Sequence, residues 1–210
     1  MAPEDDAGLP GGPGLRERKK RQTRFALSQA AIRLCVLNGW DGVTVEQIAA
    51  EAGVSVRTFR NYFGGKAEAI AATQLERMLG VAEDLLARPA GEPIWDSLRH
   101  AVLGRFVPPG GFTTSQDTRW RDGVRLMLAE PALAGEIVKV NAAATQELAR
   151  AVARRTGTDA GDLYPKLVAA AVAAGTAVAV EHALREGWPA SLGTVLAEVF
   201  EQLAAGLPVP

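Results

Sequence analysis

The chain has 210 residues, 48% of them hydrophobic, which suffices for the core of one long domain or two modest ones. Its single cysteine, Cys35, excludes an internal disulfide framework and a cysteine-rich zinc site. The net charge of -1 hides an asymmetry, because Leu15 to Lys66 hold ten basic and four acidic residues, and such a basic module on an acidic bulk indicates a polyanion partner.

Residues 1–14 contain seven Pro or Gly residues, and we expect them to form a disordered tail. This start is acidic, unlike the basic and then apolar layout of a signal peptide. The longest uncharged apolar run, between Lys166 and Glu181, has fourteen residues and is shorter than the ~18 that suggest a membrane span. The sequence therefore predicts a cytoplasmic protein with no membrane partner.

Almost every segment beyond the tail has helical periodicity, which predicts an all-α fold. The first helix is expected to end at Gly39, before Trp40. A second, short helix begins at Thr44, where Thr44 and Gln47 form a capping box. Ser55 is a good N-cap for a third helix. After Gly64-Gly65, a fourth helix is predicted from about Lys66 to Arg88.

Five further helices are predicted between Pro- and Gly-rich breaks, which makes about nine in total. They are expected at about 92–106, 117–129, 131–156, 160–187 and 190–205. We therefore divide the chain into a tail at 1–14, a three-helix domain at 15–65 and a larger helical domain at 66–210.

The second and third helices are joined by a short turn containing Gly53, as in a helix-turn-helix that places its second helix in the DNA major groove. Small or apolar residues occupy the positions that would seal the pair: Ile48, Ala49, Ala52, Val54, Phe59 and Tyr62. The alternative is a helical hairpin inside any bundle. The absence of acidic residues from Ala52 to Ala67 favours DNA, because carboxylates would repel phosphates.

Residues 25–70 resemble the tetracycline-repressor (TetR) family of transcription factors in the order and spacing of the TVEQIA helix, the AGVS turn and the RTFRNYF-x-x-K run. The resemblance implies that the third helix reads DNA, with Arg57 best able to contact guanine. Tyr62 and Lys66 would contact phosphates, and Thr44 would cap a helix whose N-terminus faces one. The expected DNA-binding residues of this region are Thr44, Ser55, Val56, Arg57, Thr58, Arg60, Asn61, Tyr62 and Lys66. Arg60 stands where the family usually has an aromatic residue, and Gly64-Gly65 replaces a Pro-Ser-like pair.

A run of basic residues precedes the first helix, and it includes Arg18, Lys19 and Arg21. These three residues are expected to track phosphates or enter the minor groove. The alternative is a solvated first turn of the first helix.

The alanine-rich helices at 160–205 are suited to close packing in a homodimer, the role that the resemblance also implies, or in a core within one chain. The resemblance further implies a pocket for an unknown small-molecule effector in the middle helices. The candidate effector contacts are Trp95, Phe106, Phe112, Trp120 and Met127, although such aromatic residues also suit a core. Arg119, Arg121 and Arg125 would favour an anionic ligand or form a solvated face.

No catalytic motif is present, and the two histidines, His100 and His182, lack partners at metal-ligand spacing. We expect no enzymatic activity, metal or cofactor, and we expect Cys35 to be a core residue. The sequence predicts a ligand-responsive repressor that binds a palindromic double-stranded DNA operator as a dimer and leaves it when an effector binds. The alternative is a helical ligand-binding or interaction module without DNA binding.

Overall fold

The computed structural model describes residues 15–107, 117–186 and 192–208, which form nine helices and no strand. The prediction of an all-α fold is confirmed. The helices are α1 (Leu15–Asn38), α2 (Val45–Glu51), α3 (Val56–Arg60), α4 (Lys66–Ala87), α5 (Ile94–Phe106), α6 (Asp117–Leu128), α7 (Pro131–Thr156), α8 (Leu163–Glu186) and α9 (Leu192–Ala204). The predicted disordered tail lies outside the described residues.

The local signals in the N-terminal region define its short helices. Thr44 and Gln47 make the reciprocal hydrogen bonds of the capping box at the start of α2. The Ser55 side chain caps α3 by accepting a hydrogen bond from the Thr58 amide. Gly53 has φ +69°, a left-handed conformation that residues with a Cβ adopt only with strain. The turn between α2 and α3 therefore depends on this glycine.

The first helix begins earlier than expected. The basic residues Arg16 to Arg21 lie within α1, whose side chains are exposed there, so they form its first turns. Their residue types have good helix propensity, and no Gly or Pro follows Gly14 until Gly39. The structure thus favours a solvated first turn of the first helix over an arm that precedes it.

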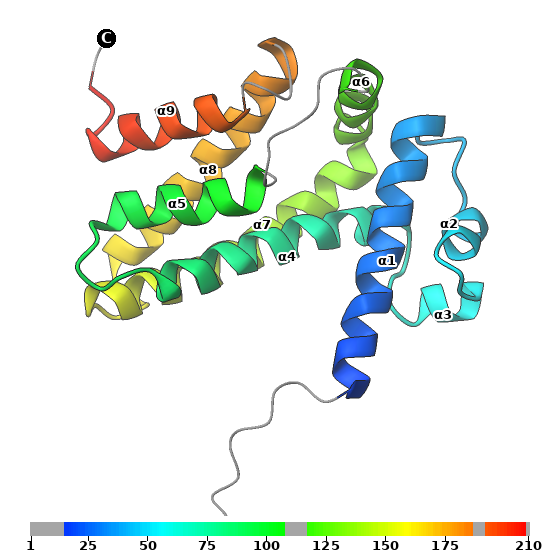
Figure 1. Ribbon diagram of the computed structural model, residues 1–210, viewed down its shortest axis with the longest axis horizontal. Coiled ribbons are helices and arrows are strands. Elements are labelled where there is room, and N and C mark those ends of the chain that lie inside the picture. The colour runs from blue at the N-terminus through cyan, green and yellow to red at the C-terminus, as the bar shows by residue number, and fades with distance from the viewer. Residues whose placement is uncertain (1–14, 108–116, 187–191, 209–210) are drawn as a thin grey trace, which may run out of the picture.

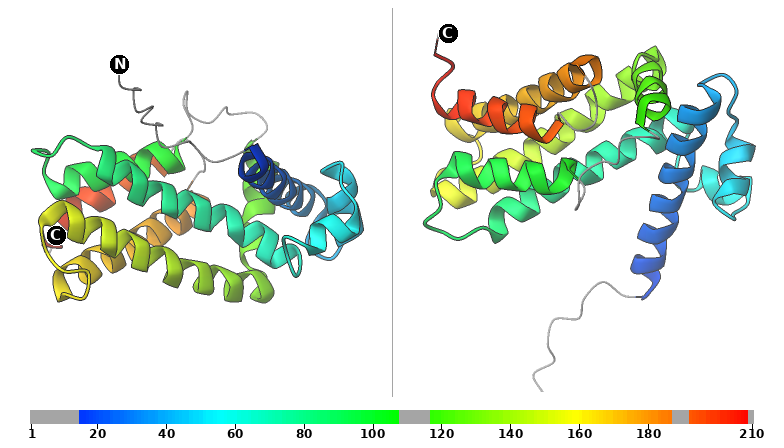
Figure 2. Two further views of the ribbon diagram at one scale, coloured as in Figure 1. Left: turned by 90° about the horizontal axis from the view of Figure 1, so that it is seen from below. Right: turned by 45° about the horizontal axis from the view of Figure 1, so that its top comes forward.

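Figure 1 shows α2 and α3 beside α1 at one end of the molecule, with α5, α8 and α9 at the other end. The long helices α4 and α7 run between the two ends and pack closely along each other. Two further views show the same division (Figure 2). We call α1–α3 the head and α5–α9 the body.

Two hydrophobic clusters form the core, and α4 contributes to both. Ala69 to Ala72 of α4 pack with the head, around Leu27, Ile48 and Phe59. Further along α4, Val81 and Leu85 pack with the body. A single continuous helix therefore joins the two clusters.

Helix α8 is the one helix of the described residues that is long and apolar enough to cross a membrane, over Leu163–Arg185 with mean hydropathy 1.7. One side of it packs in the body against α7 and α9, with Val168, Val172 and Ala179 buried. Core helices of globular proteins share this composition, and 39% of the span is buried, so the packing within the chain accounts for one side of α8.

Candidate nucleic-acid interface and effector pocket

Helix α3 presents the side chains that were expected to contact DNA. It is anchored by Phe59, which is fully buried, and its first turn is fixed by Ser55. The Ser55 Oγ lies 3.0 Å from the Thr58 amide nitrogen and 2.8 Å from the Thr58 Oγ1. Val56 and Thr58 are partly exposed, and Arg57 is exposed. The start of α3 is therefore a rigid and accessible edge.

The charges on this edge are positive. Arg57, Arg60 and Asn61 are exposed, and no carboxylate of the described residues forms an ion pair with either arginine. The pKa of the neighbouring Glu46 is lowered, first by a hydrogen bond from its own backbone amide, then by the Thr44 hydroxyl and, to a smaller extent, by the charge of Arg60. The two guanidinium groups thus remain available to an anionic partner.

The other expected contacts around α3 have different environments. Thr44 is exposed, and its hydroxyl accepts a hydrogen bond from the Gln47 amide. Tyr62 is partly buried beside Phe63. The Lys66 ammonium donates to the carbonyl oxygens of Trp40 and Val43, at 2.5 and 3.0 Å. It also lies 4.5 Å from the centroid of the Trp40 ring. Lys66 therefore ties α4 to the loop between α1 and α2.

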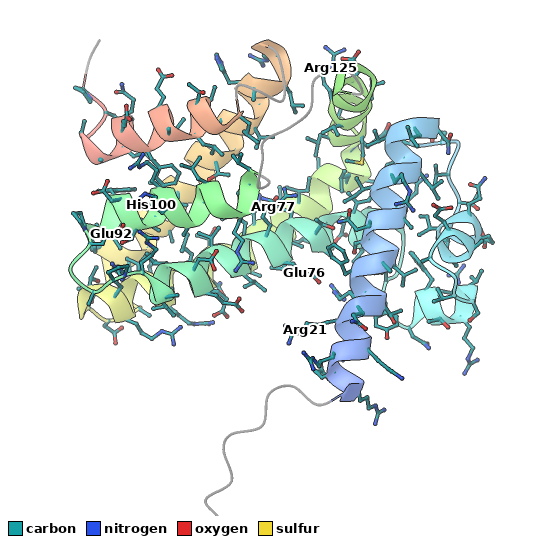
Figure 3. All side chains as sticks on the ribbon, viewed as in Figure 1. Arg21, Glu76, Arg77, Glu92, His100 and Arg125 are labelled. Atoms are coloured by element: carbon teal, nitrogen blue, oxygen red, sulfur yellow. The ribbon has the colours of Figure 1, made fainter. Side chains whose placement is uncertain are left out.

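The structure does not bring the three basic residues of α1 together. Arg18 and Arg21 line a hollow between α1 and α4 that also contains Glu76, whereas Lys19 does not line it. Figure 3 shows Arg21 and Glu76 near this crossing. Burial raises the pKa of Glu76, while the positive charges of Arg24 and Arg21 partly oppose that rise. The helical period of 3.6 residues separates Lys19 from Arg18 by about 100°.

A pocket of about 980 Å³ lies between α4, α5, α6, α7 and α8, and residues of α1 and α9 also line it. Phe106 and Met127, two of the expected effector contacts, line it. Trp95 does not line it, because it lies at the opposite end of α5 from Phe106, roughly 16 Å away along the helix axis. Phe112 lies outside the described residues, and Trp120 is in α6 but its side chain is not among those described.

Sequence reasoning named one polar residue of this pocket, Arg125, and missed others. Thr73 and Arg77 of α4, Gln29 of α1 and Asn141 of α7 line it among mostly apolar side chains. Their signal in the sequence was weak, because a threonine and an arginine four residues apart are common on any exposed helix face. Only the packing of five helices shows that this face of α4 points inward.

The residues considered for catalysis do not form a reactive cluster. His100 forms an ion pair with Glu92, while His182 is exposed on α8. Cys35 is 2% exposed, and burial raises the pKa of its thiol, although the charge of Lys66 partly opposes this. A raised pKa reduces the thiolate fraction and hence the nucleophilicity. Within the described ranges, no group of three His, Cys, Asp or Glu side chains is arranged to hold a metal ion.

The sequence matches two known families over most of its length. Residues 27–73 match "Bacterial regulatory proteins, tetR family", and residues 92–208 match "MftR C-terminal domain". The chain is 36% identical to the HTH-type transcriptional regulator TcmR of Streptomyces glaucescens, over 84% of this chain and 80% of that one. It is 30% identical to a Mycobacterium tuberculosis protein named as a mycofactocin biosynthesis transcriptional regulator, MftR, and the match covers 90% of this chain and 93% of that one.

Solved structures show the same fold. The fatty acid degradation regulator FadR of Bacillus halodurans matches with a TM-score of 0.56 and 16% identity, over 96% of this chain and all of that one. SmeT, the repressor of the Stenotrophomonas maltophilia multidrug efflux pump SmeDEF, matches with a TM-score of 0.54 and 23% identity, over 89% of this chain and 93% of that one. At these identities the likeness concerns the fold alone.

Proposed function

The chain belongs to the tetR family of bacterial transcriptional regulators, and from this membership we propose that it is a homodimeric repressor that an effector releases from its operator. Binding of DNA, and not catalysis, is then its activity, and the cytoplasm is its place of action. The exposed start of α3 carries the proposal, because it combines a fixed backbone with two arginines that have no carboxylate ion-pair partner among the described residues. The alternative of a module without DNA binding is not favoured by the transcriptional regulators to which the chain is related.

We assign DNA recognition to residues 15–65 and effector binding and dimerisation to 66–210. The α3 edge reads bases through Arg57 and contacts the backbone through its polar neighbours. The N-terminal residues of α1 add phosphate contacts and steepen the salt dependence of binding. For Lys66, the ammonium has three N–H donors, and two of them bind the carbonyl oxygens of Trp40 and Val43, so the third is left for a phosphate.

The outer face of α8 supports the homodimer. Leu163, Leu167 and Val178 are 71%, 56% and 59% exposed, and they follow helical spacing along one side. Exposed apolar stripes of this length mark protein interfaces. The opposite side of α8 packs within the chain, where a Cβ on Gly175 would lie 2.8 Å from Val199 Cγ1 of α9. The intrachain contacts take one side of α8, and the exposed apolar residues of the other side are left for a second copy. A two-fold dimer would place the two α3 helices about 34–36 Å, or a multiple of that, apart on a palindromic operator.

The contacts of α6 connect the pocket to the head. Val124, Met127 and Leu128 line the pocket and also pack against the hydrophobic cluster of the head. An effector that contacts these side chains therefore favours one position of the head over another. Operator affinity then falls by the ratio of the effector's affinities for the two conformations.

The experiment is a mobility-shift titration with the DNA that flanks the protein's own gene, at several salt concentrations. Arg57→Ala should weaken specific binding on the order of 10- to 100-fold, because a bidentate arginine–guanine contact is lost. The control is Arg154→Ala, an exposed arginine of α7 in the body, which should leave the affinity unchanged. Binding without sequence preference, or an equal effect of both variants, would contradict the proposal.

The dimer is tested by analytical ultracentrifugation. Leu167→Arg should shift the protein toward the monomer, because it places a charge on the exposed stripe of α8. A variant of similar chemistry on another exposed site, Val138→Arg of α7, should remain dimeric. A wild-type monomer at micromolar concentrations would rule out this interface.

A further inference from the structure

We propose that the pocket binds an amphipathic organic carboxylate, whose charged group pairs with Arg77 and whose apolar part fills the space between α5, α6 and α8. This inference rests on the proposed function, since it identifies the chemical class of the effector. It is carried by the contacts of Arg77, by the balance of charge around the pocket and by an unsatisfied hydroxyl beside it.

Arg77 lies on the inner side of α4, where this helix passes the C-terminal end of α5 (Figure 3). Its guanidinium carbon is 5.0 Å from the centroid of the Phe106 ring. No carboxylate of the described residues forms an ion pair with it, and burial lowers its pKa. Removing a cation from water without an anionic partner is unfavourable, and a bound carboxylate would offset this cost.

The other charges around the pocket are already neutralised or solvated. Arg105 binds Asp84 through two hydrogen bonds, of 2.6 and 2.7 Å. Glu181, the one carboxylate among the described lining residues, pairs with Arg185. Arg125, the fourth arginine, is exposed. One unpaired guanidinium remains inside, which suits a singly charged carboxylate better than a phosphate with two charges.

Thr73 provides a second polar group on the same side of α4. Its hydroxyl oxygen is buried and has no hydrogen-bond partner among the described residues. Four residues separate Thr73 from Arg77, so the two side chains lie one turn apart on one helix face. A carboxylate between them could accept hydrogen bonds from the guanidinium and from the hydroxyl. Both groups would then be satisfied by one ligand.

The rest of the pocket is suited to an apolar body. Phe106, Met127 and Leu184 are buried, and they line the pocket on three different helices. Ile70, Met78, Val124, Leu128, Ile137, Val180 and Leu192 complete the apolar lining. A volume of about 980 Å³ accommodates a ligand well beyond the size of a simple carboxylic acid such as acetate.

The experiment compares decanoate with decan-1-ol, which has the same chain but no charge, by isothermal titration calorimetry on the full-length protein. Decanoate should bind wild type on the order of tenfold or more tightly than decan-1-ol, as expected for a charge-assisted hydrogen-bonded pair. Arg77→Met, which keeps an apolar stem, should abolish this preference, because it lowers the affinity for decanoate much more than the affinity for decan-1-ol. Arg77→Lys should retain part of the preference, because it keeps the charge without the planar fork.

Arg154→Met is the control and should behave as wild type. Equal decanoate affinity in wild type and Arg77→Met, tighter binding of decyl phosphate than of decanoate, or no binding of either decyl probe to wild type would each overturn the inference. Mobility-shift assays of DNA binding, made on the same protein preparations without a decyl probe, distinguish a failure of the proposed function from a failure of the inference about the pocket. Failure of the wild-type protein to bind DNA would overturn the proposed function. Normal DNA binding by Arg77→Met, together with loss of its preference for decanoate, would support the inference about the pocket.

Discussion

The head and the body stabilise their helix ends in different ways. In the head, α2 and α3 are short and are capped by the adjacent side chains of Thr44 and Ser55. In the body, α5 and α7 begin without a side-chain cap, as does α4. The turn between α4 and α5 is held instead by Arg155 of α7, which is 58 to 70 residues distant in sequence from its partners.

This difference shows that a reading edge and a pocket need different support. Local caps fix the first turn of a short helix through neighbouring residues, which suits a surface whose backbone must keep its shape. Long-range hydrogen bonds fix helices relative to each other, and this defines a cavity between them. Four substitutions test the contrast, and they are described from the largest expected effect to the smallest.

Arg155→Met should cause the largest loss of stability. The Arg155 guanidinium donates hydrogen bonds to the carbonyl oxygens of Leu85, Arg88, Pro89 and Glu92 and to the Ser97 hydroxyl. Leaving these acceptors unpaired should lower the free energy of unfolding by about 2–4 kcal/mol. The measurement is urea unfolding, with Arg154→Met as the exposed control. An equal loss in both variants would show that the turn does not depend on these bonds.

Gly123→Ala should disturb the junction between the two regions. A Cβ at this position would lie 2.4 Å from the carbonyl oxygen of Val36 in α1, so α6 must move away from α1. The expected loss of stability is about 1–3 kcal/mol, with a change in operator affinity because α6 contacts the head. Thermal unfolding and mobility shifts measure both effects. The control, Gly193→Ala, meets its nearest atom at an ordinary 3.5 Å, so it should not lower stability and should leave operator affinity unchanged.

Gly53→Ala should have a smaller effect, confined to the head. Nothing lies within 4 Å of a Cβ at Gly53, so only its φ of +69° opposes the change, and the expected cost is about 1 kcal/mol. Gly135→Ala, on the exposed face of α7, also meets no atom within 4 Å but has no positive φ, and it should raise stability by about 0.5–1 kcal/mol. Opposite shifts of the thermal midpoint are expected, and shifts of the same sign would contradict the role given to Gly53.

The smallest effect concerns acid pH at the end of the body farthest from the head, where Glu92 and His100 lie (Figure 3). Hydrogen bonds from Arg88 and then Ser97 lower the pKa of Glu92 from 4.5 to about 2. A carboxylate with a lowered pKa stabilises the fold above its unfolded pKa, and this contribution is lost as the pH falls from about 4.5 to about 2. Unfolding midpoints measured over this range should fall more steeply for wild type than for Glu92→Gln. Parallel curves for wild type and Glu92→Gln would contradict the stabilising role given to the Glu92 carboxylate.

The sequence was most informative where structure depends on neighbouring residues. Thr44 with Gln47, Ser55 and Gly53 defined the second and third helices, and the family resemblance followed from the same segment. The lengths of the body helices were also close to those observed, because Pro and Gly end helices through their own backbone properties. The sequence left the start of α1 open, since a basic run is equally compatible with an extended arm and a helix.

The pocket and its polar groups were not predictable in this way. Trp95 and Phe106 lie on one helix, yet only Phe106 lines the pocket, because that depends on which end of α5 meets α4, α6 and α8. Arg77 and Thr73 gave no distinctive pattern, and the hydrogen bonds of Lys66 and Arg155 join residues far apart in the chain. By itself the sequence determined the helices, the family and the DNA-reading turn, because caps and turns depend on residues within about four positions. The pocket and its unpaired guanidinium were decided only by the tertiary structure, because burial and charge pairing depend on which helices meet in space.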